Sequence, residues 1–90
     1  MKNPELERCF RSVANRKRLE ILQLLARESE LPPRDIAERI RLSPKSTHKH
    51  LQQLLQTGYV EKERRRDLVF YHLDVNAPAL HKLILKFVLR

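Results

Sequence analysis

Residues 43–58 constrain the fold of this chain most, because they predict one short helix with a defined beginning and a defined end. Ser43 suits the N-cap, and Pro44 suits the first helical position, where its missing N–H costs no hydrogen bond. Gly58 stands where a left-handed residue would end the helix. One face of this helix is mostly apolar and is expected to pack on a core. It consists of Pro44, Thr47, Leu51, Leu54 and Leu55.

The opposite face of the same helix carries cations and hydrogen-bonding groups but no acids. Its members are Lys45, Ser46, His48, Lys49, Gln52, Gln53 and Gln56. No Asp or Glu occurs between Glu38 and Glu61, and the whole chain has a formal net charge of +8. Such a charge indicates a polyanionic partner. Nucleic acid is the first candidate, and an anionic membrane surface is the second.

The length and composition of the chain predict a single small domain that spans residues 1–90. A content of 41% hydrophobic and 33% charged residues is typical of a globular chain and not of a disordered one. The single cysteine, Cys9, excludes an intramolecular disulfide. The N-terminus has no apolar leader, and the apolar C-terminus is too short to span a bilayer. We therefore expect a cytoplasmic protein with no membrane partner.

Capping residues and breakers set the order of the predicted helices before residue 43. Asn3, followed by Pro4 and Glu5, begins a first helix, and Asn15 begins a second. Pro32-Pro33 ends that second helix and opens a short third one. The helix beginning at Ser43 is then the fourth, and it follows the third after a tight turn.

After Gly58 the apolar residues change to the two-residue period of strands. Val60, Val69, Tyr71 and Leu73 predict two strands, with Arg65-Arg66-Asp67 as the hairpin turn between them. A last helix opens at residues 76–78. The predicted order is four helices, two strands and one helix, a mainly α fold with a small β-hairpin.

The last helix, expected within residues 77–90, has apolar residues around most of its circumference. One small domain cannot cover such a helix from every side, whereas a second copy of the chain could. We therefore expect a homodimer in which the terminal helices, residues 3–14 and 77–90, form the contact. The expected interface residues are Leu6, Phe10, Leu80, Leu83, Ile84, Phe87 and Val88.

This order of elements is that of a winged helix-turn-helix, and within that class the chain resembles the ArsR-type repressors. Three stretches carry the resemblance: Ala14-Asn15-Arg16-Lys17-Arg18-Leu19-Glu20-Ile21-Leu22, then Leu42-Ser43-Pro44-Lys45-Ser46-Thr47-His48-Lys49-His50-Leu51, and Gly58-Tyr59-Val60 with Tyr71-His72-Leu73. The resemblance implies a transcriptional regulator that binds double-stranded DNA. A homodimeric repressor on a roughly palindromic operator is the expected form.

The sequence departs from the ArsR pattern at two turns and at the metal sites. Arg41 and the hairpin turn stand where the family usually has Gly, and Asp67 is expected to adopt the left-handed conformation in the hairpin. Metal-sensing members use paired cysteines on the third helix or an Asp/His/Glu set on the last. Here the third helix has no cysteine, and the last has only His81. We expect no metal and no cofactor, and the effector is unknown.

In a helix-turn-helix, the second helix enters the major groove, and the wing reaches phosphates or a minor groove. The residues expected to contact DNA are Lys45, Ser46, His48, Lys49, His50, Gln52, Arg64, Arg65 and Arg66. Other interpretations stay open for several of them. Lys45 and Lys49 could belong to an ordinary solvated helix face, and His48 could be a metal ligand. His50 could be a packed side chain, and the three arginines could form a solubilising turn.

Alternatives also stay open for Cys9, for two histidines and for the function as a whole. Cys9 suits a buried structural thiol better than a redox switch, because Leu6, Phe10 and Val13 surround it on the helix. His72 and His81 suit surface or core positions better than an interface metal site. The competing function is a winged helix that binds protein or RNA. An enzyme is disfavoured, because the sequence shows no nucleophile–base set, carboxylate pair, metal spacing or phosphate loop.

Overall fold

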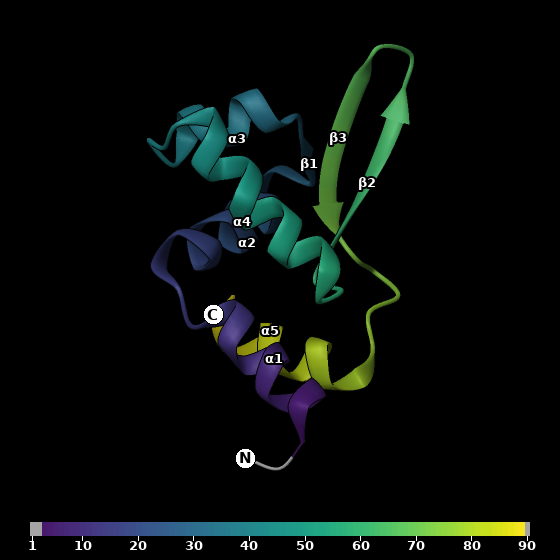
Figure 1. Ribbon diagram of the computed structural model, residues 1–90. Coiled ribbons are helices and arrows are strands. Elements are labelled where there is room, and N and C mark those ends of the chain that lie inside the picture. Colours follow the sequence, from purple (N-terminus) through teal and green to yellow (C-terminus); the bar gives the residue numbers. More distant parts are fainter. Residues whose placement is uncertain (1–2, 90) are drawn as a thin grey trace.

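The computed structural model describes residues 3–89, so residues 1, 2 and 90 of the expected domain lie outside the described part. Figure 1 shows α1 and α5 together at one end of the molecule, the hairpin of β2 and β3 projecting at the other, and α4 between them. The elements are α1 (Pro4–Val13), α2 (Arg16–Glu28), β1 (Glu30–Leu31), α3 (Pro33–Arg39), α4 (Pro44–Gln56), β2 (Val60–Arg65), β3 (Leu68–Leu73) and α5 (Ala79–Val88).

Local side-chain caps place the beginnings of three helices where the sequence predicts them. The Asn3 side chain accepts hydrogen bonds from backbone amides of the first turn of α1. Asn15 Oδ1 accepts from the Arg18 amide at 3.1 Å, and Ser43 Oγ accepts from the Ser46 amide at 3.1 Å. Each cap satisfies a donor that has no partner within the helix. These interactions confirm the predicted N-caps.

The core lies between α2, α4 and the base of the hairpin. Five aliphatic side chains from three helices are fully buried there, and burial of each one stabilises the fold by about 1.5–3 kcal/mol. They are Ile21 and Leu22 from α2, Ile36 from α3, and Leu51 and Leu54 from α4. Tyr59, just before β2, is also fully buried. This packing fixes α4 by its apolar face and leaves the opposite face outside.

The sheet contains a strand that the sequence analysis missed. It has three antiparallel strands in the order β1-β3-β2, and β1 pairs Glu30 with His72 and Leu31 with Tyr71. In the hairpin, the pairs run from Val60↔Leu73 to Arg65↔Leu68, which confirms the predicted hairpin. A two-residue strand shows no period, so its sequence carries no signal. Its effect is to attach the hairpin to the end of α2.

The left-handed backbone positions agree with the sequence at two turns and differ at the third. Arg41 has φ 56° and Gly58 has φ 83°, as expected for the residues that end α3 and α4. At the hairpin tip Arg66, and not Asp67, has the positive φ of 57°. The two-residue turn places that conformation at its first central position, which overrides the preference of Asp for it. The prediction for Asp67 was therefore wrong.

Arg41 offers a direct test of backbone strain. The Arg41 amide donates to Glu38 O at 3.3 Å and the Leu42 amide to Ala37 O at 3.0 Å, the pattern of a Schellman cap. Glycine adopts this conformation without the steric cost that a side chain adds. Arg41→Gly is expected to raise the free energy of unfolding by about 1 kcal/mol, measured by urea denaturation. The control Arg39→Gly, at the last residue of α3, should lower it instead, because glycine disfavours the helical conformation and the ion pair of Arg39 with Glu28 is lost. A lower midpoint for Arg41→Gly would contradict the assignment of strain.

Candidate DNA-binding surface

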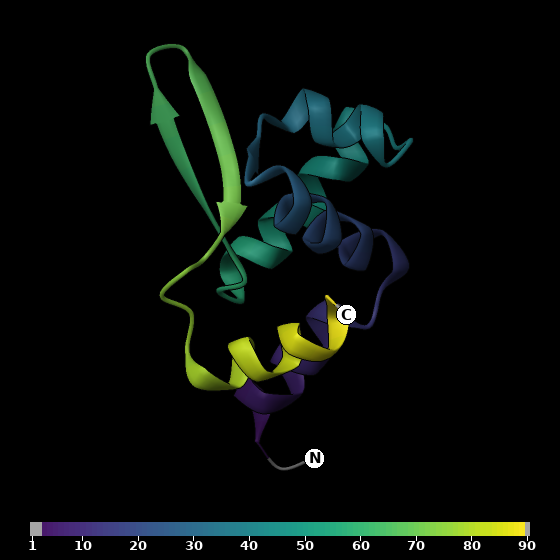
Figure 2. The ribbon, with the colours of Figure 1, turned by 180° about the vertical axis from the view of Figure 1, so that it is seen from behind.

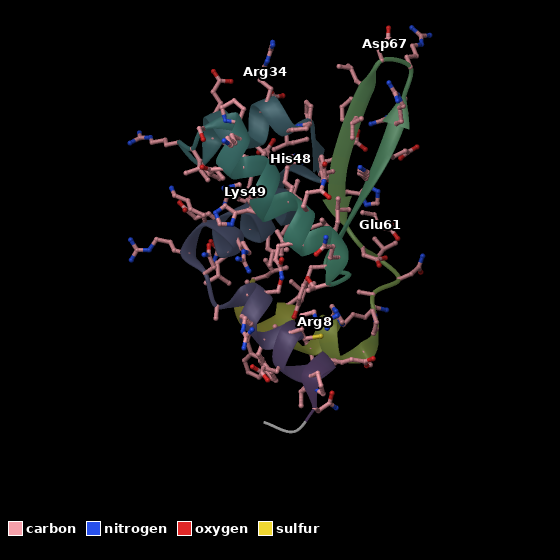
Figure 3. All side chains as sticks on the ribbon, in the orientation of Figure 1. Arg8, Arg34, His48, Lys49, Glu61 and Asp67 are labelled. Carbon is pink, nitrogen blue, oxygen red and sulfur yellow. The ribbon has the colours of Figure 1, made fainter. Side chains whose placement is uncertain are left out.

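The structure separates α4 into an inner and an outer face. Thr47, Leu51 and Leu54 are buried, whereas Lys45, His48 and Lys49 are exposed. Figure 3 shows His48 and Lys49 on α4, below Arg34 of α3 in this view. Ser46 and Gln52 are half-buried beside them, and Pro44 is exposed although it shares the side of the apolar residues. The outer face therefore presents cations and hydrogen-bonding groups to solvent.

The beginning of α4 adds a partial positive charge to this surface. The first turn of α4 has no acid, and the N-terminus of the helix is capped by the neutral Ser43. Unpaired backbone amides at a helix N-terminus favour anions. Lys45 lies in that same turn. A phosphate or the acceptor edge of a base pair is the ligand that this arrangement fits.

The three arginines of the hairpin have different surroundings. Arg64 and Arg66 are exposed. Arg65 forms an ion pair with Glu30 of β1, and its guanidinium carbon lies 4.1 Å from the centre of the Phe70 ring. Arg65 thus holds the hairpin to β1, a role that the sequence analysis did not foresee. Because its charge is partly compensated, Arg65 is less available to a phosphate than its neighbours.

Strand alternation adds one cation that the sequence analysis missed. Lys62 and Arg64 are two residues apart on β2, so their side chains share one face of the hairpin. Arg65 lies on the other face with Glu61 and Glu63. The two-residue period was the available signal, and it assigns Lys62 to the side of Arg64.

This difference between the faces of the hairpin predicts a difference between two variants. Arg64→Ala is expected to weaken duplex binding by about fivefold, because one phosphate contact is lost from each copy. Arg65→Ala also removes one positive charge, but this charge is already paired with Glu30. The affinity of this variant for the duplex should therefore fall by about twofold or less. Fluorescence anisotropy at one salt concentration measures the duplex affinity of both variants. Equal losses would show that Arg65 reaches DNA despite Glu30.

His50 was expected among the DNA-contacting residues, but the structure ties it to α2. Its Nδ1 accepts a hydrogen bond from Arg18 Nε at 3.2 Å, and the ring is half-buried. Burial, and then the Arg18 charge, lower the pKa of His50 below its ordinary value. The ring is therefore neutral near pH 7 and serves as an acceptor inside the protein. The packed alternative describes His50 better, and we leave it out of the proposed DNA-contacting set.

The other end of the molecule carries the face expected to form a dimer. Figure 2 shows α5 in front of α1 when the molecule is seen from behind. Phe10, Leu83 and Phe87 are 45%, 52% and 65% exposed. Leu6, Leu80 and Val88 are half-buried. Ile84, expected in the interface, is only 7% exposed because it packs into the core of its own chain, so little of its surface is left for a contact with a second copy.

Cys9 and His81 meet where α1 packs on α5. Cys9 Sγ lies 3.6 Å from His81 Nε2, and both residues are buried. Tyr59 Oη donates to Cys9 O at 2.9 Å, and burial raises the pKa of Tyr59 to about 12, which keeps that donor protonated. Cys9 is therefore a buried thiol, as its neighbours on the helix indicated.

Within residues 3–89, His, Cys, Asp and Glu side chains form no group of three that could hold a metal ion. None of the helices described is long and apolar enough to cross a bilayer.

Comparison with known proteins identifies the class to which this fold and surface belong. The family model described as winged helix-turn-helix DNA-binding matches residues 15–61, from the beginning of α2 into β2. Because the match covers more than half of the 90 residues, the chain belongs to this family. It is a DNA-binding protein of the transcriptional-regulator type, with the expected winged helix-turn-helix fold. A comparison with curated proteins gave no match.

Solved structures confirm the resemblance to ArsR-type regulators. The chain is similar to reduced HlyU from Vibrio cholerae, with 26% identity and a TM-score of 0.77 over 93% of this chain and 84% of that one. It is also similar to Mb0332 from Mycobacterium bovis, a homodimeric winged helix-turn-helix domain described as a possible ArsR-family regulator, with 27% identity, a TM-score of 0.78 and coverages of 92% and 77%. It is similar as well to NolR from Sinorhizobium fredii, with 25% identity and a TM-score of 0.80 over 93% of this chain and 80% of that one.

Proposed function

We propose that this chain is a homodimeric repressor that binds a roughly palindromic duplex in the cytoplasm, with one α4 helix in each half-site. The observation that carries the proposal is the acid-free outer face of α4, where Lys45, His48 and Lys49 are exposed at and after the positive end of the helix. A face of this composition matches the acceptors of the major groove and the phosphates at its edge. A protein-binding helix would gain little from excluding every acid.

The proposed contacts follow from the position of each side chain on α4. Lys45, in the first turn, donates to guanine O6 or N7, and Ser46 donates to a neighbouring base or phosphate. Lys49, one turn further, binds a phosphate, and Gln52 reaches adenine or the backbone. His48 lies on the same surface as a polar contact. Arg64 and Arg66 of the wing bind phosphates or the adjacent minor groove.

The homodimer is supported by the exposed apolar residues of α1 and α5. Phe10 and Leu83 leave about half of their surface in water in the single chain, which an isolated small domain avoids when it can. The similar domain Mb0332 is homodimeric in solution. Two-fold pairing through these helices would place both α4 helices about one helical turn of DNA apart.

Selection from random duplexes tests the proposal directly. The chain is incubated with a random library at moderate salt, and bound DNA is recovered and sequenced over several rounds. We expect an inverted repeat, with affinity that falls steeply as salt rises, because Lys49, Arg64 and Arg66 of each chain neutralise phosphates. Single-stranded RNA of random sequence serves as the competing ligand. Enrichment of RNA alone, or of no nucleic acid, would refute duplex binding.

A further inference from the structure

The first turn of α2 contains three consecutive cations at the end of the helix that disfavours them. Arg16, Lys17 and Arg18 begin the helix, and no acid accompanies them in that turn. Cations near the positive end of the helix dipole destabilise it, by about 0.3–1 kcal/mol each. Arg16 is exposed, but Lys17 and Arg18 are half-buried. Contacts with the rest of the protein must therefore offset the unfavourable position of these two side chains.

Arg18 connects two helices that are separate in the sequence. Its Nε donates to His50 Nδ1 of α4 at 3.2 Å, and its Nη1 donates to Ser12 O of α1 at 3.2 Å. The planar guanidinium holds several donors in a fixed geometry, so one side chain can set the relative position of two acceptors. Lys17 makes a similar connection, because its Nζ donates to Ile40 O at the end of α3 at 2.7 Å.

Ser12 provides a second connection between α1 and α4. Its hydroxyl lies 2.8 Å from Thr57 Oγ1 at the end of α4, and Ser12 is fully buried. The Thr57 hydroxyl already donates its proton to Gln53 O at 2.9 Å. Ser12 must therefore be the donor in its bond with Thr57. Ser12 is thus connected to α4 at two places, directly through its hydroxyl to Thr57 and indirectly through its backbone oxygen and Arg18 to His50.

These two places lie on one side of α4 and well apart along it. His50 and Thr57 are seven residues apart, which corresponds to about two turns and about 10 Å along the helix axis. A single contact would let a helix pivot, whereas two contacts separated along the axis fix its direction. The Thr57 contact comes directly from α1, and the His50 contact is tied to α1 through Arg18; α1 is one of the two helices proposed to form the dimer.

We propose that Arg18 is a positioning residue for DNA binding, which acts with Ser12 to fix the direction of α4 relative to α1 and thereby sets the half-site spacing that the dimer accepts. This inference rests on the proposed homodimeric function. Each base pair added between half-sites rotates one of them by about 35° and shifts it by about 3.4 Å. The dimer can discriminate against such a change in half-site spacing only if α4 is rigidly connected to α1.

The test separates half-site spacing from half-site affinity. Arg18→Met keeps a long side chain but removes both donors. Three probes are used: the palindrome selected by the wild type, the same palindrome with one base pair inserted at its centre, and a single half-site. The wild type should prefer the original spacing by about tenfold, because the inserted base pair must be absorbed by deforming the DNA. For Arg18→Met we expect this preference to fall to about twofold, with half-site affinity within about twofold of wild type.

Binding to the single half-site distinguishes a positioning role of Arg18 from a general structural role. A single half-site is bound by one α4 helix, whose beginning depends on Ser43 and whose packing depends on Leu51 and Leu54. If Arg18→Met loses affinity for all three probes by the same factor, or keeps the full spacing preference, the proposal is overturned. Arg16→Met, which removes an exposed cation from the same turn, is the matched control and should behave as the wild type.

A second variant and a second measurement cover the remaining outcomes. His50→Leu removes the acceptor of the same bond, and should show the same loss of spacing preference; it decides the question if Arg18→Met does not fold. The pKa of His50 is measured by NMR titration without DNA. It should rise in Arg18→Met, because a nearby positive charge is removed, and an unchanged pKa would overturn the proposed link. If the wild type selects no duplex, the proposed function fails, and the titration alone decides whether Arg18 holds α4.

Discussion

Lys49→Ala is expected to weaken binding of the selected duplex by at least about tenfold, a loss of about 1.4 kcal/mol or more. Lys49 is exposed on the outer face of α4, one turn beyond the capped beginning of the helix. In the proposed dimer it is present twice, so its removal deletes two phosphate contacts. Anisotropy titrations at several salt concentrations measure both the affinity and its salt dependence. The slope of log K against log salt should become less steep by about two, which a merely misfolded fraction would not produce.

Arg8→Ala is the matched control for Lys49→Ala. It removes one positive charge from an exposed position on α1, and Figure 3 shows Arg8 at the end of the molecule away from the wing. If affinity depended only on net charge, both variants would weaken binding equally. We expect Arg8→Ala to bind within about twofold of wild type, since exposed charges more than a Debye length away are screened. Equal losses, with sedimentation showing intact dimers, would mean that the outer face of α4 does not contact DNA.

The elements whose signals are local were predictable from the sequence, and α4 shows this best. Its N-cap, its first-turn proline and its C-terminal glycine lie within the segment itself, and the apolar period identifies the buried face. The strand β1 lacked such a signal, because two residues have no period and depend on pairing with β3 far along the chain. The hairpin tip was misassigned for a related reason. Strand register, and not the preference of Asp67, decides which residue takes the positive φ.

The candidate site was predictable as a face but not as a set of free side chains. Lys45, His48 and Lys49 are outside because Thr47, Leu51 and Leu54 are inside, a consequence of the helical period. Two other expected residues have internal partners that no local pattern reveals. Arg65 pairs with Glu30, which is 35 residues away, and His50 accepts from Arg18, which is 32 residues away. Such pairs depend on the three-dimensional fold.

The last helix shows a similar limit. Its apolar residues surround most of the helix, so the sequence could not separate the side that packs on the core from the side left outside. The structure does so: Ile84 and Leu85 are buried, whereas Leu83 is exposed. The interface expected from the apolar residues of the two terminal helices therefore included Ile84, which the structure places in the core of the single chain, and the interface as a whole stays a proposal.

Leu83→Glu is expected to convert the dimer into monomers, and it is the sharpest test of the proposed interface. The Leu83 side chain is 52% exposed in the single chain, so glutamate is tolerated in the monomer. In the dimer, the symmetric contact would bury a carboxylate from each copy among apolar side chains, where an unpaired charge costs several kcal/mol. Sedimentation velocity should therefore show monomers at concentrations where the wild type is dimeric. Circular dichroism should show an unchanged helix content.

The same substitution should strongly weaken binding of the palindrome. When two half-sites are bound by linked helices, the second contact is effectively intramolecular, and losing that linkage lowers affinity by about 10² or more. Half-site affinity should be retained, because Leu83 belongs to α5 and is not among the residues proposed to contact DNA. Leu68→Glu is the matched control for the oligomeric state alone, because Leu68 is 57% exposed but begins β3 at the wing, at the end opposite α1 and α5. It should remain dimeric. A dimeric Leu83→Glu would place the subunit contact on another face, and a monomer that keeps full affinity for the palindrome would separate dimerisation from DNA binding altogether.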